Sequence, residues 1–273
     1  MKNHLKKVGV FALVGLMGLA VQAQIIDPLT GSLGGYTTTM VLDNNLGAGN
    51  GVSFTSSGSG LQANFIGTGS SPEQALLLAP VTSFSTIFAV GDRLTVNVAV
   101  PNGQQSGSVT ADFGLAIAAT ATPTAASAGN GWNSRTLFDW ASVSVRPPQS
   151  SIRANSSISG TLVTGSGVLS GVGSSTVSQL YIDWVSADVF TLGYIDTSAV
   201  AHASETITFA GASTIGAAIG FYSDMRDQGS PPITTLGNFT DLTIAPVPEP
   251  TSMALCGLGG VLGLAGWLRR KNR

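Results

Sequence analysis

The sequence predicts an all-β protein, a single antiparallel β-sandwich of the jelly-roll type, flanked by an N-terminal signal helix and a C-terminal transmembrane helix. Between Gln24 and Ala245, Gly, Ser, Thr, Asn and Pro interrupt the chain about every eight to twelve residues, which is the spacing of short strands and turns. Inside many of these pieces apolar and polar residues alternate, so one face of each strand belongs to a core. Two sheets packed face to face are the stable way to cover such faces.

The clearest strand covers residues 93–100, where Leu94, Val96, Val98 and Val100 oppose Arg93, Thr95 and Asn97. Segments 141–145, 205–209 and 239–244 repeat this alternation with Ser or Thr at many outward positions, which predicts an exposed surface of hydroxyl groups. Longer apolar segments predict strands that are buried on both faces or bent at glycine, namely 75–81, 85–90, 113–119 and 215–222. Segments rich in Gly, Ser and Thr predict loops, at 55–60, 120–131 and 164–176.

The N-terminus has the three parts of a secretory signal peptide. Lys2, Lys6 and Lys7 precede an apolar run over residues 8–21, and small residues follow at a cleavage position. We expect cleavage between Ala23 and Gln24, which divides the chain into a signal peptide (1–23), a β-sandwich domain (24–245) and a C-terminal segment (246–273).

The charge and cysteine content of the exported part restrict its possible partners and the interactions that can stabilise it. The segment from Asp27 to Glu249 holds all fourteen carboxylates but only five arginines and no lysine, a formal charge of −9. Phosphate contacts need clusters of Lys or Arg, so nucleic acid is excluded as an expected partner. The single cysteine, Cys256, lies in the C-terminal apolar run, so the domain must be stabilised by its core without disulfides.

The C-terminus combines a Pro-Glu-Pro motif, an apolar run and a basic tip. The run over residues 251–268 is about 27 Å long as a helix, just enough to span a bilayer core of about 30 Å. The basic tip, with Arg269 and Arg270, is expected to stay in the cytoplasm, which places the domain outside the inner membrane.

This end resembles the PEP-CTERM sorting signal of Gram-negative bacteria that produce exopolysaccharide, through Val247, Pro248, Glu249, Pro250 and the Arg-rich tip. The resemblance implies export, transient anchoring in the inner membrane, and processing by an exosortase-like enzyme. The expected partners are therefore the export machinery, signal peptidase and an exosortase, and the expected destination is the outer envelope or extracellular matrix. A plain stop-transfer anchor is the alternative.

The segment from 179 to 244 is similar to the last third of laminin-G-like and concanavalin-like sandwiches, which implies the same architecture. It lacks the paired E-x-D-x-x-E strand motif of the concanavalin-like glucanases. The domain also has one histidine, His202, expected at a solvated strand edge, and no G-x-S-x-G nucleophile motif. We therefore expect a protein that is not an enzyme, with a glycoside hydrolase as an alternative that would need two carboxylates in an open cleft.

We expect no cofactor and no metal site. Asp43-Asn44-Asn45 and the pair Asp224 and Asp227 offer oxygen ligands for calcium, but Asx-rich turns explain them more simply. Asp183, Asp188 and Asp196 are expected at solvated strand ends. Among the aromatic residues, Trp140 and Trp184 are expected in the core, and Trp132 is the candidate for an exposed contact with carbohydrate. The sequence thus predicts a protein of the envelope or matrix, with a polysaccharide-binding module as the alternative.

Overall fold

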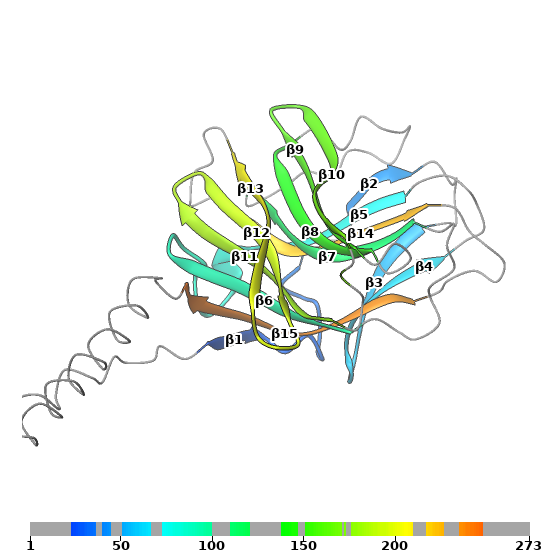
Figure 1. The fold of residues 1–273 in the computed structure, drawn as a ribbon. Coiled ribbons are helices and arrows are strands. Elements are labelled where there is room, and N and C mark those ends of the chain that lie inside the picture. Colours follow the sequence, from blue (N-terminus) through cyan, green and yellow to red (C-terminus); the bar gives the residue numbers. More distant parts are fainter. Residues whose placement is uncertain are drawn as a thin grey trace, which may run out of the picture. The chain divides into compact units, whose positions relative to one another are not determined.

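The computed structural model describes residues 23–36, 40–44, 51–66, 73–99, 110–120, 138–146, 151–170, 172, 176–209, 217–226 and 235–247. Within Gln24–Ala245, which form one compact unit, two antiparallel sheets face each other (Figure 1). This arrangement confirms the predicted all-β sandwich.

Sheet A has eight strands, seven of them in the order β13-β12-β11-β6-β15-β4-β3, and β1 pairs with β15 beside them. Its strands are β1 (Gln24–Asp27), β3 (Gly51–Ser57), β4 (Gly60–Ile66), β6 (Asp92–Ala99), β11 (Val177–Ser186), β12 (Val189–Asp196), β13 (Ala201–Thr208) and β15 (Thr235–Pro246).

Sheet B has seven strands in the order β10-β9-β8-β7-β14-β5-β2. Its strands are β2 (Met40–Asn44), β5 (Glu73–Pro80), β7 (Thr110–Ala118), β8 (Trp140–Arg146), β9 (Ser151–Ile158), β10 (Thr161–Ser170) and β14 (Ala218–Arg226).

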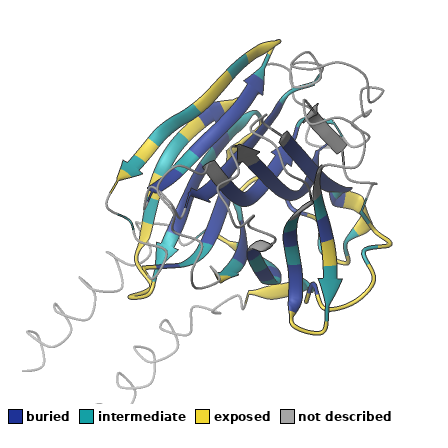
Figure 2. Cartoon of the chain, turned by 90° about the vertical axis from the view of Figure 1, so that its right-hand side faces the viewer, coloured by how far each residue is buried: buried dark blue, intermediate teal, exposed yellow. Residues whose placement is uncertain are grey.

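The core between the sheets is formed by the apolar positions that the alternation predicted. Leu94 and Val96 of β6, Val143 of β8 and Leu242 of β15 are fully buried in it. Phe239 of β15 packs against Phe113 and Phe221 of sheet B, with ring centroids 5.6 and 4.9 Å apart. Figure 2 shows the buried residues in the central strands and the exposed ones toward edges and turns.

Strand β15 changes its edge partner at a bulge. Phe239 pairs with Leu61 of β4, whereas Leu242 pairs with Asp27 of β1. Asp241 between them has a φ of 52°, a left-handed conformation that Asp tolerates better than most residues. Its Oδ2 accepts a hydrogen bond of 3.0 Å from Asn97 Nδ2, which stabilises the bulge. Because the bulge accommodates one extra residue on β15, both Phe239 and Leu242 point into the core although they are three positions apart.

Three local predictions were wrong. Residues 55–60 do not form a loop, since β3 extends to Ser57 and β4 begins at Gly60 after a tight turn. Residues 85–90 do not form a strand: a 3-10 turn at Val81–Ser83 and the turn at Gly91, with a φ of 93°, leave only Phe88 of this stretch fully buried. Residues 164–170 are not a loop but the second half of β10, where Gly165 and Gly167 adopt positive φ and interrupt the register with β9.

The predicted hydroxyl surface exists at the sheet edges but not on β8. Thr206 and Thr208 of β13 are exposed, as expected, and so are Thr161 and Ser170 of β10. Ser142 and Ser144 of β8 also point away from the core, yet both are fully buried. The outer face of sheet B is therefore closed to solvent at β8 and open at its edge strand β10.

Candidate functional site

The outer face of sheet B carries a row of aromatic and charged side chains, which we call the polar face: Gln74, Asp112, Trp140, Arg146, Tyr222 and Asp224. The rings of Trp140 on β8 and Tyr222 on β14 stack, with centroids 5.6 Å apart and planes inclined by 24°. Strand β7 runs between them and presents Gly114, Ala116 and Ala118 on this face beside the rings, as the strand register shows. These small residues leave the space in which the two rings meet.

The charged side chains of the polar face are ion-paired or hydrogen-bonded within it. Arg146 makes a bidentate ion pair with Asp112, with Nη2 to Oδ2 at 2.6 Å and a shorter bond from Nε to Oδ1. Asp224, the cross-strand neighbour of Asp112, accepts hydrogen bonds from Gln74 Nε2 at 2.8 Å and from Tyr222 Oη at 3.4 Å. Burial raises the pKa of Asp112 to about 6, Arg146 opposes this rise, and the Asp224 carboxylate adds to it.

The polar face is closed to solvent. Trp140, Tyr222 and Asp112 have no exposed surface, and Arg146 keeps 7%. Its charged groups are paired as a buried network should be, so the arrangement orders and stabilises sheet B. The open cleft that the glycoside hydrolase alternative needs is not formed by the described residues here.

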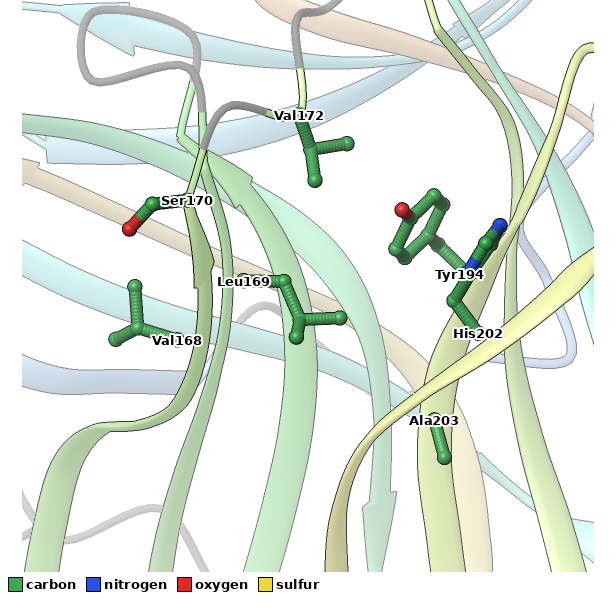
Figure 3. A pocket seen from close by; sticks show the side chains of 7 residues that line it. All are labelled: Val168, Leu169, Ser170, Val172, Tyr194, His202 and Ala203. Carbon is green, nitrogen blue, oxygen red and sulfur yellow. The ribbon is translucent and has the colours of Figure 1, made fainter.

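An open pocket lies where the edges of the two sheets meet, which we call the edge pocket (Figure 3). It has a volume of about 460 Å³ and is lined by β10, β12, β13 and the residue Val172. Its lining residues are Val168, Leu169, Ser170, Val172, Tyr194, His202 and Ala203.

The two sheet edges are joined directly beside the edge pocket. Ser204 Oγ of β13 donates a hydrogen bond of 2.5 Å to the carbonyl oxygen of Gly167 on β10. A Cβ at Gly167 would stand 2.4 Å from the Ser204 carbonyl oxygen, so glycine is required for this approach. The pocket is therefore held open at a fixed width by backbone contacts.

Three side chains form a connected group at the pocket wall. The rings of Tyr194 and His202 stack with centroids 4.7 Å apart and planes inclined by 15°. His202 Nε2 lies 2.9 Å from Oδ2 of Asp196, whose Oδ1 accepts hydrogen bonds from the backbone N–H groups of Ser198 and Val200. The hydrogen bond with His202, followed by the backbone donors, lowers the pKa of the Asp196 carboxyl.

This group combines an aromatic surface with polar atoms that solvent can reach. The His202 side chain is 39% exposed. In Figure 3 the Tyr194 ring extends between His202 and Val172, and Leu169 points toward it from the opposite wall. Such a pocket fits a small ligand that has both apolar C–H surfaces and hydroxyl groups.

The structure confirms several predicted placements. Trp140 and Trp184 are buried, and His202 lies on the edge strand β13. The prediction of a solvated strand end was wrong for Asp183, which is 7% exposed and makes a bidentate ion pair with Arg93 at 2.6 and 2.7 Å. The guanidinium of Arg93 also lies 4.1 Å above the Tyr181 ring.

Several predicted site residues lie outside the described residues. These are Trp132 and the sorting residues Pro248, Glu249, Pro250, Arg269 and Arg270. Ala23 and Gln24 are both exposed, and Gln24 begins β1.

Sequence reasoning missed the Asp112–Arg146 ion pair, because its partners are 34 residues apart and no local spacing links them. It also missed the pairing of Asp196 with His202, although their separation of six residues across one turn was a usable signal.

The described part of the chain contains no group of three metal-ligating His, Cys, Asp or Glu side chains. Asp224, one of the candidate calcium ligands, instead binds Gln74 and Tyr222. Among the described residues, no helix has the length and apolar character to cross a membrane, and the predicted span 251–268 lies outside them.

Residues 246–271 match the PEP-CTERM protein-sorting motif. The C-terminal end is therefore a sorting signal, which implies an exported protein that is transiently anchored in the membrane. A search of curated proteins gives no match.

Solved structures with a similar arrangement of strands include the carbohydrate binding module CBM66 from Bacillus subtilis (9% identity, 77% of this chain and 94% of that chain, TM-score 0.37). A second is a LamA variant from Z. galactanivorans in complex with laminaritriose and laminaritetraose (11% identity, 82% and 97%, TM-score 0.46). A third is a glycoside hydrolase family 16 endo-glucanase from Bacteroides ovatus (8% identity, 77% and 94%, TM-score 0.31). At these identities the likeness concerns the fold alone.

Proposed function

We propose that this exported protein is a polysaccharide-binding component of the cell envelope or extracellular matrix, and that it binds glycan in the edge pocket. The observation that carries the proposal is the stacked pair Tyr194 and His202 in the wall of an open pocket of about 460 Å³. This volume lies within the range of about 300–1,000 Å³ that is usual for small-molecule sites.

The chemistry of the edge pocket suits a sugar residue. Val168, Leu169 and Val172 supply an apolar wall for the C–H face of a pyranose ring. Ser170 Oγ, Tyr194 Oη and the His202 imidazole can exchange hydrogen bonds with its hydroxyl groups. Because the pocket opens at the sandwich edge, a chain end or a branch of a long polymer can enter while the polymer continues outside.

The sorting signal supports this destination. An exosortase-like enzyme would cut the chain near Val247–Pro250 and release the β-sandwich from its anchor, so the mature protein keeps no transmembrane helix. Binding to matrix polysaccharide would then retain the released domain at the outer surface.

A steric block at the pocket mouth tests the proposed site. Ser170 is exposed, so Ser170→Trp places a large ring beside the pocket without disturbing the core. Thr161→Trp, at an exposed position on the same strand, is the matched control. With exopolysaccharide from a PEP-CTERM-encoding bacterium on beads, we expect retention of the wild type and Thr161→Trp and loss of retention of Ser170→Trp. Equal retention of all three would overturn this site.

The same assay tests Trp132 as a carbohydrate contact. If Trp132→Ala releases the protein from the beads and Ser170→Trp does not, the glycan site lies around Trp132 and not in the edge pocket. If neither variant is released, or the wild type is not retained on any matrix glycan, the polysaccharide-binding function itself is wrong.

A further inference from the structure

One end of the sandwich exposes a set of large apolar side chains, which we call the apolar rim: Ile25, Ile87, Val90 and Val185. They keep 54%, 59%, 49% and 54% of their surface in solvent. Among the described residues, seven large hydrophobic side chains are exposed, and the rim contains four of them.

The rim residues come from three separate parts of the chain that are fastened together. Thr86 Oγ1, beside Ile87, donates a hydrogen bond of 2.6 Å to Oε1 of Gln24, beside Ile25. The backbone N–H of Gly91, beside Val90, donates a bond of 2.8 Å to the carbonyl oxygen of Trp184, beside Val185. The four side chains therefore surround the same end of sheet A.

The segment that carries Ile87 and Val90 is held in a defined conformation. Phe88 is buried and packs on Trp184, with ring centroids 5.3 Å apart. The N–H of Ala89 donates to Asp92 Oδ2, and the N–H of Asp92 donates to the Ala89 carbonyl oxygen, both at 3.0 Å. Phe88 thus anchors the segment in the core, while its apolar neighbours face solvent.

The chain leaves the sandwich at this same end. Gln24 pairs with Ile244, and β15 ends at Pro246. Strand β6 runs antiparallel to β15, because Thr95 contacts Thr243 and Asn97 contacts Asp241. Arg93, near the start of β6, therefore lies level with the end of β15. Asp183 pairs with Arg93 in turn, which places the end of β11 there too.

We propose that the apolar rim contacts the outer surface of the lipid bilayer while the C-terminal tail is inserted. Four residues lie between Pro246 and Thr251, where the predicted membrane span begins, so the two positions are five steps apart along the chain. A fully extended chain covers at most about 3.3–3.6 Å per residue. The end of β15 is therefore confined to within about 18 Å of the hydrocarbon boundary, close to the headgroup layer.

The charges around the rim select the kind of lipid. Asp27 and Asp92 are close by, the nearby cation Arg93 is paired with Asp183, and the domain has no lysine. Anionic headgroups are repelled by this arrangement, so the contact is apolar and directed to zwitterionic lipid. Half-exposed aliphatic side chains suit the boundary between headgroups and acyl chains.

A fluorescence experiment tests the contact on the uncut chain. Residues 24–273 with Cys256→Ser are placed in nanodiscs of zwitterionic phosphatidylcholine, and Ile87→Cys is labelled with the fluorophore NBD. The matched control is Val200→Cys, because Val200 is 51% exposed and lies in the turn between β12 and β13. This turn is at the opposite end of β12 from the β11–β12 turn, beside which the rim residue Val185 lies. Brominated phosphatidylcholine quenches only fluorophores that reach the acyl chains.

We expect brominated lipid to remove most of the emission at position 87 and none at position 200. Equal emission from both lipids at position 87, with folding confirmed by circular dichroism, would overturn the proposal. A blue shift at position 87 that grows with protein concentration without quenching would assign the rim to self-association, and would overturn it too. Val90→Cys repeats the measurement if Ile87→Cys does not fold. The outcome is independent of glycan binding.

Discussion

Gln24, the first residue of β1, pairs with Ile244, two residues before the end of β15. The first and last strands of the domain are thus neighbours, and β1 closes that edge of β15 where β4 has already ended. This pairing brings the predicted signal-peptide cleavage position, after Ala23, and the start of the sorting signal, at Pro246, to the same end of the sandwich. Both cuts would leave only short remnants outside the sheet.

The processed ends can be read by intact-mass spectrometry of protein from the outer surface. We expect an N-terminus at Gln24 and a C-terminus between Pro246 and Thr251, because the sorting signal begins at residue 246 and its Pro-Glu-Pro motif lies in that short stretch. A protein that retains Arg273 at the outer surface would contradict removal of the tail. Substitution of Glu249 by Ala should raise the fraction of uncut chain in the inner membrane.

The two Arg–Asp pairs should differ in their contribution to stability. In Arg146→Ala the fully buried Asp112 loses its partner, which should reduce the free energy of unfolding by about 3–5 kcal/mol. In Arg93→Ala water can reach Asp183, whose side chain is 10% exposed, so the loss should be smaller, about 1.5–3 kcal/mol. Urea unfolding of both variants measures the difference, and equal losses would show that the polar face is wetter than described.

The stability of the domain should depend on pH through Asp112. Burial raises the pKa of Asp112 in the folded state to about 6, above its unfolded value, so folding takes up a proton between these two values. Its stabilising contribution is complete below the unfolded pKa of about 3.9 and is lost as the pH rises through about 6. Asp112→Asn does not titrate, so the advantage of the wild type over this variant should shrink over that range.

The stability contribution of Asp196 should change with pH in the opposite direction to that of Asp112. Its pKa is lowered by the hydrogen bond with His202, so its contribution is present above the unfolded pKa and is lost as the pH falls through the folded value. The advantage of the wild type over Asp196→Asn should therefore shrink toward acidic pH. If the difference in free energy of unfolding between wild type and variant changed with pH in the same direction for both variants, the surroundings described for Asp112 or for Asp196 would be wrong.

Gly193 of β12 should not tolerate a side chain. A Cβ there would lie 2.5 Å from Cζ and Oη of Tyr181 and 2.2 Å from the carbonyl oxygen of His202. Gly193→Ala should therefore destabilise the domain by about 1–3 kcal/mol through overpacking. Gly58→Ala is the control, because nothing lies within 4 Å of its Cβ position. Thermal unfolding of the two variants should separate them clearly.

Much of the fold could be predicted because alternation is a local signal. In β6, Leu94 and Val96 alternate with Arg93 and Thr95, and any strand with this pattern buries its apolar side. The error at 85–90 has the same origin. This stretch is apolar enough for a buried strand, yet only Phe88 enters the core, because Val81–Ser83 and Gly91 turn the chain on either side.

The candidate site was less accessible to prediction. Asp196 and His202 were each noted as separate residues in the sequence. Their assembly with Tyr194 depends on the turn between β12 and β13 and on the register Tyr194↔His202. The pocket itself needs β10, whose second half was predicted as a loop. A strand that is interrupted by glycines at positive φ has no alternation to reveal it.

By itself, the sequence determined that the chain carries a PEP-CTERM sorting signal, and it predicted a signal peptide and a lysine-free domain of alternating strands. Each of these is written in contiguous residues, because export and sorting enzymes read short linear segments. Only the tertiary structure decided what the domain presents after sorting. The edge pocket, the closed polar face and the apolar rim each combine residues from strands distant in sequence, and which side chains meet across two sheets depends on strand order and register, which no local pattern specifies.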